Sequence, residues 1–134
     1  MNVRQFELEL DREWAAALED VHEAVSLIGL TAFRGVVLKS PVDKGRFKGN
    51  WNLAIGSMDA STTEAVDPAG GQTINRAAGA ISAYSAIEGF PVINITNALP
   101  YAERLEDGYS AQAPGGMVGL TVAEIQAQFD GMDV

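Results

Sequence analysis

The sequence predicts an α+β fold in which a long N-terminal helix packs on a small antiparallel β-sheet, with short helices and a C-terminal helix. Three observations favour this class. Apolar residues recur at steps of three and four over the first part of the chain, two short segments have strand patterns, and helices and strands are mixed along the chain. The 134 residues match one domain, with the helix at 1–39 and the sheet, short helices and loops at 40–134.

A helix is predicted from about Val3 to Leu38 because its apolar residues form a single stripe. The stripe consists of Phe6, Leu10, Trp14, Leu18, Val21, Val25, Ile28 and Ala32. Pro41 must end the helix, whereas Gly29 and Gly35 weaken its last third and leave a bend or an early end open. An unbroken helix would be roughly 50 Å long, so its stripe must either bend back or pack on another copy.

The middle of the chain predicts a turn, a strand, a loop and a short helix. Residues 40–50 are rich in turn-forming and basic residues, and residues 51–56 alternate as a half-buried strand does. Residues 57–72 are small and polar, which predicts a mobile loop. Asn75 is predicted to cap a short helix that ends at Gly89.

The last third of the chain contains the clearest strand pattern and a helix start signal. Residues 92–97, VINITN, predict the second strand. Residues 100–108 predict one or two helical turns closed by a glycine, and residues 111–119 predict a loop. Thr121 and Glu124 have the spacing of a capping box, so we expect the last helix to begin there.

The composition predicts a soluble, acidic protein. Eighteen acidic and nine basic residues give a net charge of −9, which disfavours a general nucleic-acid binder. No uninterrupted apolar run approaches the roughly 18 residues of a membrane span and no signal-peptide pattern opens the chain, so we expect no membrane partner. The absence of cysteine excludes disulfides and thiolate metal sites, and it permits a reducing compartment.

The basic residues are concentrated in one segment, residues 34–48, which has two interpretations. Its cations could form a phosphate-binding strip, so a nucleic-acid-binding module is the alternative function. They could instead pair with acidic surface of the same chain or of a neighbouring copy, which we favour because stacking aromatic rings are few here. The cations are Arg34, Lys39, Lys44, Arg46 and Lys48.

The sequence contains no pattern typical of an enzyme, a metal site or a cofactor site. His22 is the single histidine, and in the middle of a helix we expect it to be a packing or surface residue. Glu103, Glu106 and Asp107 could form an acid pair, but on a short turn such residues more often face solvent. We therefore predict that the protein is not an enzyme and has no cofactor.

Three stretches together resemble a family of phage proteins. Residues 40–51, SPVDKGRFKGNW, resemble the SPVDTG…W segment of neck and tail-completion proteins of long-tailed bacteriophages, the relatives of lambda minor tail protein Z. Residues 97–108 resemble the family's N…PYA…LE.G stretch, and residues 112–118 resemble its QAP.GMV loop. The stretches lie in the family's order, and the likeness covers residues 4–130. One departure is Lys44, where the family commonly has threonine.

The resemblance implies a structural virion protein, made in the bacterial host cytoplasm and placed at the head–tail neck. It implies a homo-oligomeric ring, six-fold to match the tail tube, that joins the head connector to the tail. The implied partners are head-completion or connector, tail-terminator and tail-tube proteins. DNA would pass through the channel without specific binding, because the acidic surplus would repel it.

The positions matched by the family motifs are the candidate interface or structural residues. Pro41 and Gly45 suit a sharp exit from the helix, and Asp43 can accept backbone N–H groups within the turn. Phe47 and Trp51 are large apolar groups that would anchor the turn. The complete set is Pro41, Asp43, Gly45, Arg46, Phe47, Trp51, Pro100, Tyr101, Glu106, Gly108, Pro114 and Met117.

Overall fold

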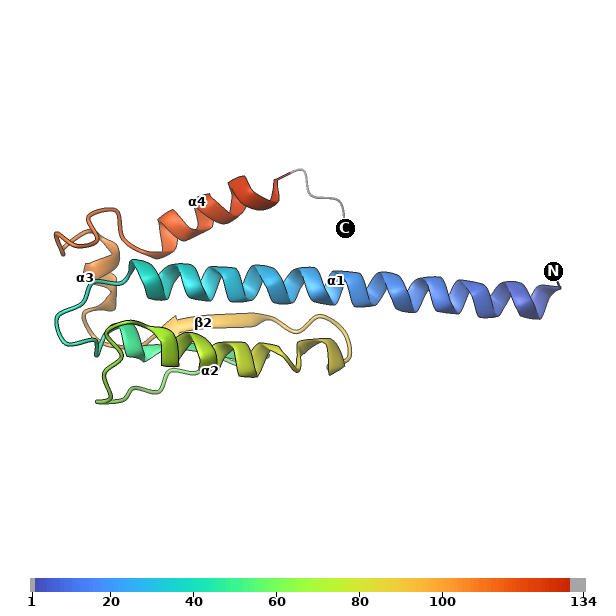
Figure 1. Cartoon of the computed structure of the whole chain (residues 1–134), viewed down its shortest axis with the longest axis horizontal. Coiled ribbons are helices and arrows are strands. Elements are labelled where there is room, and N and C mark those ends of the chain that lie inside the picture. The colour runs from blue at the N-terminus through green and yellow to red at the C-terminus, as the bar shows by residue number, and fades with distance from the viewer. Residues whose placement is uncertain (1, 131–134) are drawn as a thin grey trace.

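The computed structural model describes residues 2–130 and confirms the α+β class. A two-stranded antiparallel sheet is combined with one long helix and several shorter ones (Figure 1). The α-helices and strands are α1 (Val3–Lys39), β1 (Trp51–Ile55), α2 (Gly71–Ile81), β2 (Ile93–Asn97), α3 (Ala102–Glu106) and α4 (Val118–Phe129). Two short 3₁₀ helices, η1 (Lys48–Asn50) and η2 (Tyr84–Ala86), lie between them.

The long helix α1 is the axis on which the other elements are arranged. The sheet and α2 lie along one side of its C-terminal half and α4 lies along another, while the N-terminal half projects beyond them (Figure 1). Every side chain described between Asn2 and Ala17 is exposed. We call residues 3–17 the arm. The helix therefore neither bends back nor buries its N-terminal half within the chain.

The two strands pair as the sequence pattern predicts. Leu53 lies opposite Ile95 in the antiparallel register, and Ile55 lies opposite Ile93. Leu53 and Ile95 also pack against the buried core, so the alternating positions of both strands give the sheet its apolar face.

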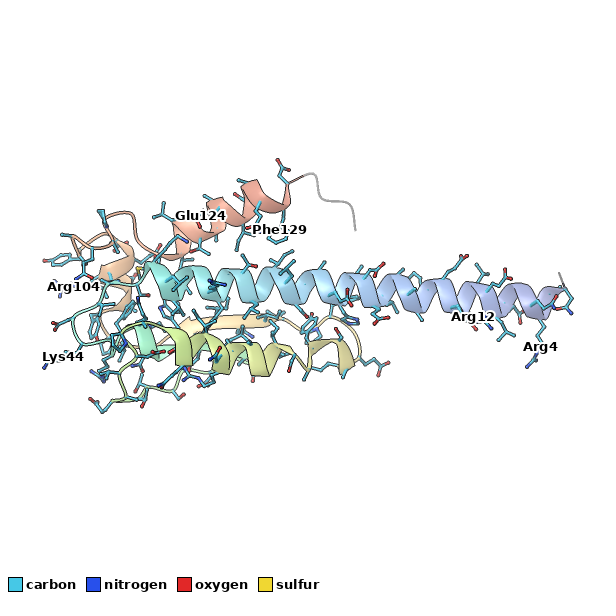
Figure 2. All side chains as sticks on the ribbon, viewed as in Figure 1. Arg4, Arg12, Lys44, Arg104, Glu124 and Phe129 are labelled. Carbon is cyan, nitrogen blue, oxygen red and sulfur yellow. The ribbon has the colours of Figure 1, made fainter. Side chains whose placement is uncertain are left out.

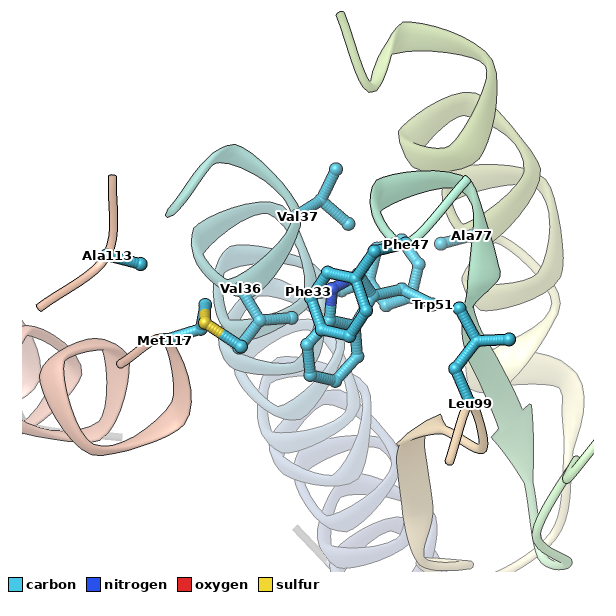
Figure 3. Packing of buried hydrophobic residues seen from close by; sticks show 9 residues of the cluster. All are labelled: Phe33, Val36, Val37, Phe47, Trp51, Ala77, Leu99, Ala113 and Met117. Carbon is cyan, nitrogen blue, oxygen red and sulfur yellow. The ribbon is translucent and has the colours of Figure 1, made fainter. Parts of the chain in front are cut away.

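The core lies at the C-terminal end of α1 and draws residues from this helix and from much of the chain that follows it. Phe33 and Val37 of α1 are almost completely buried, and Trp51 packs beside them at the start of β1 (Figure 3). Met117, just before α4, packs on the Val36 side of this helix (Figure 3). The buried cluster is Phe33, Val36, Val37, Phe47, Trp51, Ala77, Leu99, Ala113 and Met117.

A buried chain of hydrogen bonds joins the end of α1 to the first strand. The indole Nε1 of Trp51 donates to Ser40 Oγ at 2.7 Å, and Ser40 Oγ donates to the carbonyl oxygen of Val36 at 2.7 Å. Ser40 has an extended backbone because Pro41 follows it, and this geometry ends the helix. The serine thus satisfies a helix carbonyl and the indole at the same time.

The glycines of α1 serve close packing rather than a bend or an early end. The helix runs unbroken through both of them to Lys39. A Cβ atom at Gly29 would lie 2.8 Å from Ile93 Cδ1, and one at Gly35 would lie 2.7 Å from Thr121 Cγ2. Glycine at these positions lets the sheet and α4 approach the helix backbone.

The predicted boundaries of the second helix were wrong at both ends. Helix α2 begins at Gly71 and ends at Ile81, so Asn75 lies inside it and does not cap it. The first turn is capped instead by Asp67, whose Oδ2 accepts from the backbone N–H of Thr73 at 2.8 Å and from its hydroxyl. The prediction failed because Asp67 lies in the preceding loop, outside the usual position of a cap.

The segment predicted as a mobile loop is held to η1 and β1 by two asparagines. Asn50 accepts from the backbone N–H of Thr63 at 2.8 Å and donates to the Thr63 carbonyl oxygen at 3.0 Å. Asn52 donates to the carbonyl oxygen of Ser61 at 2.9 Å. These hydrogen bonds give residues 57–72 a defined path although most of their side chains are exposed.

One helix among the described residues, α1, contains an 18-residue stretch that could cross a membrane by length and composition alone. Charged residues interrupt this stretch, so it is not an uninterrupted apolar run. The same helix carries Phe33, Val36 and Val37 of the buried core, and core helices pass such a test as readily as membrane helices do.

The buried indole is expected to dominate the stability of this core. Replacing Trp51 by phenylalanine removes the donor to Ser40 and leaves a small cavity, so the free energy of unfolding should fall by about 2–3 kcal/mol. Trp14→Phe is the matched control, because Trp14 is 68% exposed and its replacement should cost less than about 0.5 kcal/mol. Urea denaturation followed by circular dichroism measures both, and equal losses would contradict this assignment.

Candidate interaction site

The three motif stretches, far apart in sequence, meet at one end of the molecule. Residues 40–51 leave the end of α1, residues 97–108 contain α3, and residues 112–118 lead into α4. Figure 2 shows Lys44 and Arg104 at this end and Arg4 and Arg12 at the opposite end, on the arm. A side-chain hydrogen bond or hydrogen-bond pair connects each stretch to the next.

Asn97 and Phe47 connect the first stretch to the second. Asn97 Nδ2 donates to the carbonyl oxygen of Phe47 at 3.0 Å. The ring of Phe47 is buried between two other rings, with its centroid 5.9 Å from that of Trp51 and 5.9 Å from that of Tyr101. The side chains of Phe47 and Trp51 are therefore buried beside the turn and pack it against the core.

Gln112 connects the third stretch to the first. Its Oε1 accepts from the backbone N–H of Val42 at 2.8 Å, and its Nε2 donates to the Val42 carbonyl oxygen at 3.0 Å. The amide thus pairs with both backbone groups of one residue, much as a neighbouring strand would. Sequence reasoning included Gln112 in a motif but did not identify this role, because nothing local in the sequence indicates its partner.

Glu106 connects the second stretch to the third and caps α4. Its Oε1 accepts from the backbone N–H groups of Met117 and Val118 at 2.8 Å each, and its Oε2 accepts from Gly119 at 3.0 Å. Partial burial alone would raise the pKa of Glu106, but these three donors outweigh burial and hold the pKa below its ordinary value. The carboxylate also faces the positive end of the helix dipole.

The predicted capping box at the start of the last helix was wrong. Helix α4 begins at Val118, so Thr121 lies within it and is buried. Glu124 pairs with Lys39 of α1 at 2.7 Å instead of reaching back to a cap position. The helix begins earlier than predicted because Glu106 satisfies its first N–H groups from outside the segment.

Two glycines among the predicted site residues are required by backbone geometry. Gly45 has φ +94°, and its carbonyl oxygen accepts from the backbone N–H groups of Gly49 and Asp67. Gly108 has φ +85° after α3, and a Cβ atom there would collide with the carbonyl oxygen of Pro114. Both positions disfavour any other residue, which explains their place in the motifs.

The first and second stretches border an open cleft of about 390 Å³. Its apolar lining comes largely from Pro41, Val42, Phe47, Tyr101 and Leu105. Tyr101 is 37% exposed at the edge of the cleft. The exposed side chains of Asp43 and Lys44 lie at the same site, so an apolar surface is bordered by both charges.

The remaining predicted residues divide between the core and the surface. Met117 is 1% exposed and belongs to the core, whereas Pro100 and Pro114 are exposed. The proline at 100 follows the end of β2 by three residues. Within residues 2–130 the side chain of Asp43 accepts no hydrogen bond from the turn, and Gln112 orders that turn instead.

Two of the five cations of the basic segment form ion pairs with glutamates of the same chain. Lys39 pairs with Glu124 at 2.7 Å, Arg46 pairs with Glu64 at 3.0 Å, and Lys48 is buried. Arg34 and Lys44 are exposed. This arrangement supports the interpretation of a basic turn paired with acidic surface of its own chain.

His22 is a packing residue, as expected. It is buried, its Nε2 donates to the carbonyl oxygen of Gly89 at 2.6 Å, and its ring stacks on Phe90 with centroids 4.5 Å apart. The histidine thereby ties the segment before β2 to α1. In the part of the chain that the structure describes, no group of three or more histidine and acidic side chains could hold a metal ion.

Comparisons with protein-family models, with curated proteins and with solved structures give no match. A functional proposal must therefore rest on features of this chain. These features are the three motif stretches, the hydrogen bonds that join them, and the cleft beside them.

The capping role of Glu106 predicts a specific pH dependence. Because the folded pKa is below the unfolded one, the stabilisation is fully present above the unfolded pKa and is lost as the pH falls through the folded pKa. Glu106→Gln should lower the free energy of unfolding by about 1–2 kcal/mol at pH 7. The difference from the parent chain should shrink as the carboxyl becomes protonated below about pH 4.

Urea denaturation between pH 3 and pH 7 measures this difference. Glu103→Gln is the matched control, because Glu103 lies on the same short helix and is exposed. The control should stay within about 0.5 kcal/mol of the parent chain at every pH. A Glu106 variant that behaves like the control would contradict the capping role.

Proposed function

We propose that this chain is a structural protein of a tailed bacteriophage that forms a ring at the head–tail neck and joins the head connector to the tail. In this role the protein performs no catalysis and uses no cofactor. It is made in the host cytoplasm and becomes part of the virion. A homo-oligomeric ring, six-fold to match the tail tube, is part of the proposal.

The observation that carries this proposal is the contact among the three motif stretches. Asn97 joins the second stretch to the first, Gln112 joins the third to the first, and Glu106 joins the second to the third. Residues 42 and 112 are 70 positions apart, so their hydrogen bonds are tertiary contacts and do not follow from local sequence. The three stretches that resemble one family also form one surface of this chain. This supports the proposal that the surface has the function of that family.

The cleft at this end has the chemistry of a protein-binding surface. Aromatic and aliphatic groups form much of its lining, and polar and charged residues, among them Asp43, Lys44 and Arg46, complete it. Protein interfaces commonly have such an apolar centre with a polar rim, and tyrosine is enriched at the positions that contribute most to binding. We assign the cleft to a neighbouring neck or tail protein.

The charge distribution supports the proposal that the chain does not bind DNA. The net charge is −9, and two of the five cations of the basic segment are paired with glutamates. An acidic channel wall repels DNA and lets it pass. Nucleic-acid binding through residues 34–48 is the alternative function.

Electron cryomicroscopy of the phage particle that carries this chain tests the proposal directly. We expect density for the chain as a ring between the capsid vertex and the tail tube. A mature particle with the chain absent from this region would overturn the neck role. Salt-sensitive DNA binding that is lost in the triple variant Lys44→Ala, Arg46→Ala, Lys48→Ala would favour the alternative.

The assignment of the cleft predicts an effect of single substitutions on partner binding. Tyr101→Ala should weaken binding to the connector or tail partner of the same phage at least tenfold, or about 1.4 kcal/mol, because the ring lies at the cleft edge. Tyr109→Ala is the matched control, since Tyr109 is 73% exposed and lies outside the cleft lining. Sedimentation of the purified proteins measures both affinities, and equal effects would contradict the assignment.

A further inference from the structure

The outer edge of β2 carries main-chain groups that no other described segment pairs. In antiparallel strands, residues that exchange hydrogen bonds with the partner strand alternate with residues whose N–H and C=O groups point away from it. The N–H of Gly56 donates to the carbonyl oxygen of Val92 at 2.8 Å, at the end of the β1–β2 register. Ile93 and Ile95 therefore direct their main-chain groups outward. Within residues 2–130, no main-chain hydrogen bond from another segment reaches them.

The outer edge of β1, in contrast, is already covered. Arg76 of α2 donates to the carbonyl oxygen of Trp51 at 3.0 Å, an oxygen that points outward by the same alternation. Asn52 donates to the carbonyl oxygen of Ser61 and holds the following loop beside this strand. Of the two described strands, β2 is thus the one to which a further strand can be added.

The features that usually protect an edge strand from pairing do not occur in β2. Proteins protect such edges with lysine, with proline, with bulges or with inward-pointing charges. The strand has the sequence INITN and pairs with β1 residue for residue, without a bulge. The nearest prolines, Pro91 and Pro100, lie outside the strand, and residues 89–102 include no charged residue. The edge is therefore open to another extended chain.

The apolar groove beside this edge can take the side chains of an added strand. It has a volume of about 580 Å³, with Val25 and Ile28 of α1 on one wall and Ile93 and Ile95 on the other. Residues directly opposite each other in antiparallel strands point to the same face of the sheet. Alternate side chains of an added strand would therefore enter the groove against α1. A helix bonds its main chain internally, so the outward groups of β2 select an extended chain.

A second copy of β2 matches this edge in hydrogen bonding and in charge. Two identical antiparallel edges are complementary to each other about a two-fold axis. Two copies repel each other in general because each carries a net charge of −9, but residues 89–102 add no charge at this edge. Helix α1 runs in the same direction as β2 (Figure 1). The two-fold axis therefore places the acidic N-terminal halves of the two helices, and the two Glu88 side chains, at opposite ends of the joint sheet.

We propose that the β2 edges of two copies pair antiparallel about a two-fold axis and join their sheets into one four-stranded sheet. Full overlap of the five-residue strands places Ile95 opposite Ile95 of the second copy, and Asn94 opposite Thr96. The contact goes beyond the proposed function and does not depend on it, because a two-fold contact pairs chains and does not by itself close a ring.

Cysteine variants test this register, since the chain has no cysteine of its own. Asn94 and Thr96 would face each other across the new pair without exchanging hydrogen bonds, with Cα atoms about 4.5 Å apart, which a disulfide can span. Asn94→Cys mixed with Thr96→Cys should therefore give a disulfide-linked pair of chains under mild oxidation. Either variant alone places its two thiols diagonally, with Cα atoms about 7–8 Å apart, and should give at most a trace.

Amide hydrogen exchange of the parent chain measures the same contact without a substitution. The N–H groups of Asn94 and Thr96 face β1 and should be protected at every protein concentration. The N–H groups of Ile93 and Ile95 should gain at least tenfold protection as the concentration rises and the dimer forms. Neighbouring residues of one strand thus serve as the control for one another.

Lysines placed across the interface test its energetics. The double variant Asn94→Lys, Thr96→Lys sets like charges directly opposite each other, so it should weaken dimerisation at least tenfold in sedimentation equilibrium. Gln72→Lys, Asn75→Lys is the matched control, because it adds the same charge at exposed positions of α2. The control should change dimerisation less than twofold, and circular dichroism should show both variants folded.

The outcomes separate this inference from the proposed function. A chain that stays monomeric at all concentrations overturns the pairing. So does self-association in which the outward amides of β2 stay unprotected or the mixed cysteine variants do not link. Protection that requires a different protein assigns the edge to that protein and also overturns the pairing of copies. A phage particle without this chain at its neck removes the proposed function and leaves the result for the β2 edge unchanged.

Discussion

Three side-chain links between distant segments hold together the end of this fold that contains the cleft. A two-stranded sheet is marginal by itself in water, and here it has five residues in each strand. Asn97, Gln112 and Glu106 join the turn after α1, the segment after β2 and the start of α4. Closing such long loops costs chain entropy, so the links depend on the buried cluster around Phe33 and Trp51 that brings the segments together.

Elements with a local physical cause could be predicted from the sequence. The stripe of α1 and the stop at Pro41 predict a helix that ends within one residue of the observed Lys39. Both strands follow from alternation or β-branched residues over five positions. The starts of α2 and α4 could not be predicted, because their first N–H groups are satisfied by Asp67 and Glu106, which lie outside the usual cap positions.

The candidate site could be predicted as a set of residues but not as an arrangement. Phe47, Trp51 and Met117 belong to the buried core, while Gly45 and Gly108 adopt positive φ angles. Hydrogen-bond partners 50 and 70 positions away leave no trace in a single sequence, which is why the roles of Asn97 and Gln112 emerge only in three dimensions. Of the residues singled out beforehand, Tyr101 lies at the accessible edge of the cleft.

The two halves of α1 differ in local stability because only the C-terminal half packs against the rest of the chain. Its second half belongs to the cooperative unit built on Phe33 and Val37, so its amides open only when that unit unfolds. The arm lacks such contacts and can fray and reform turn by turn.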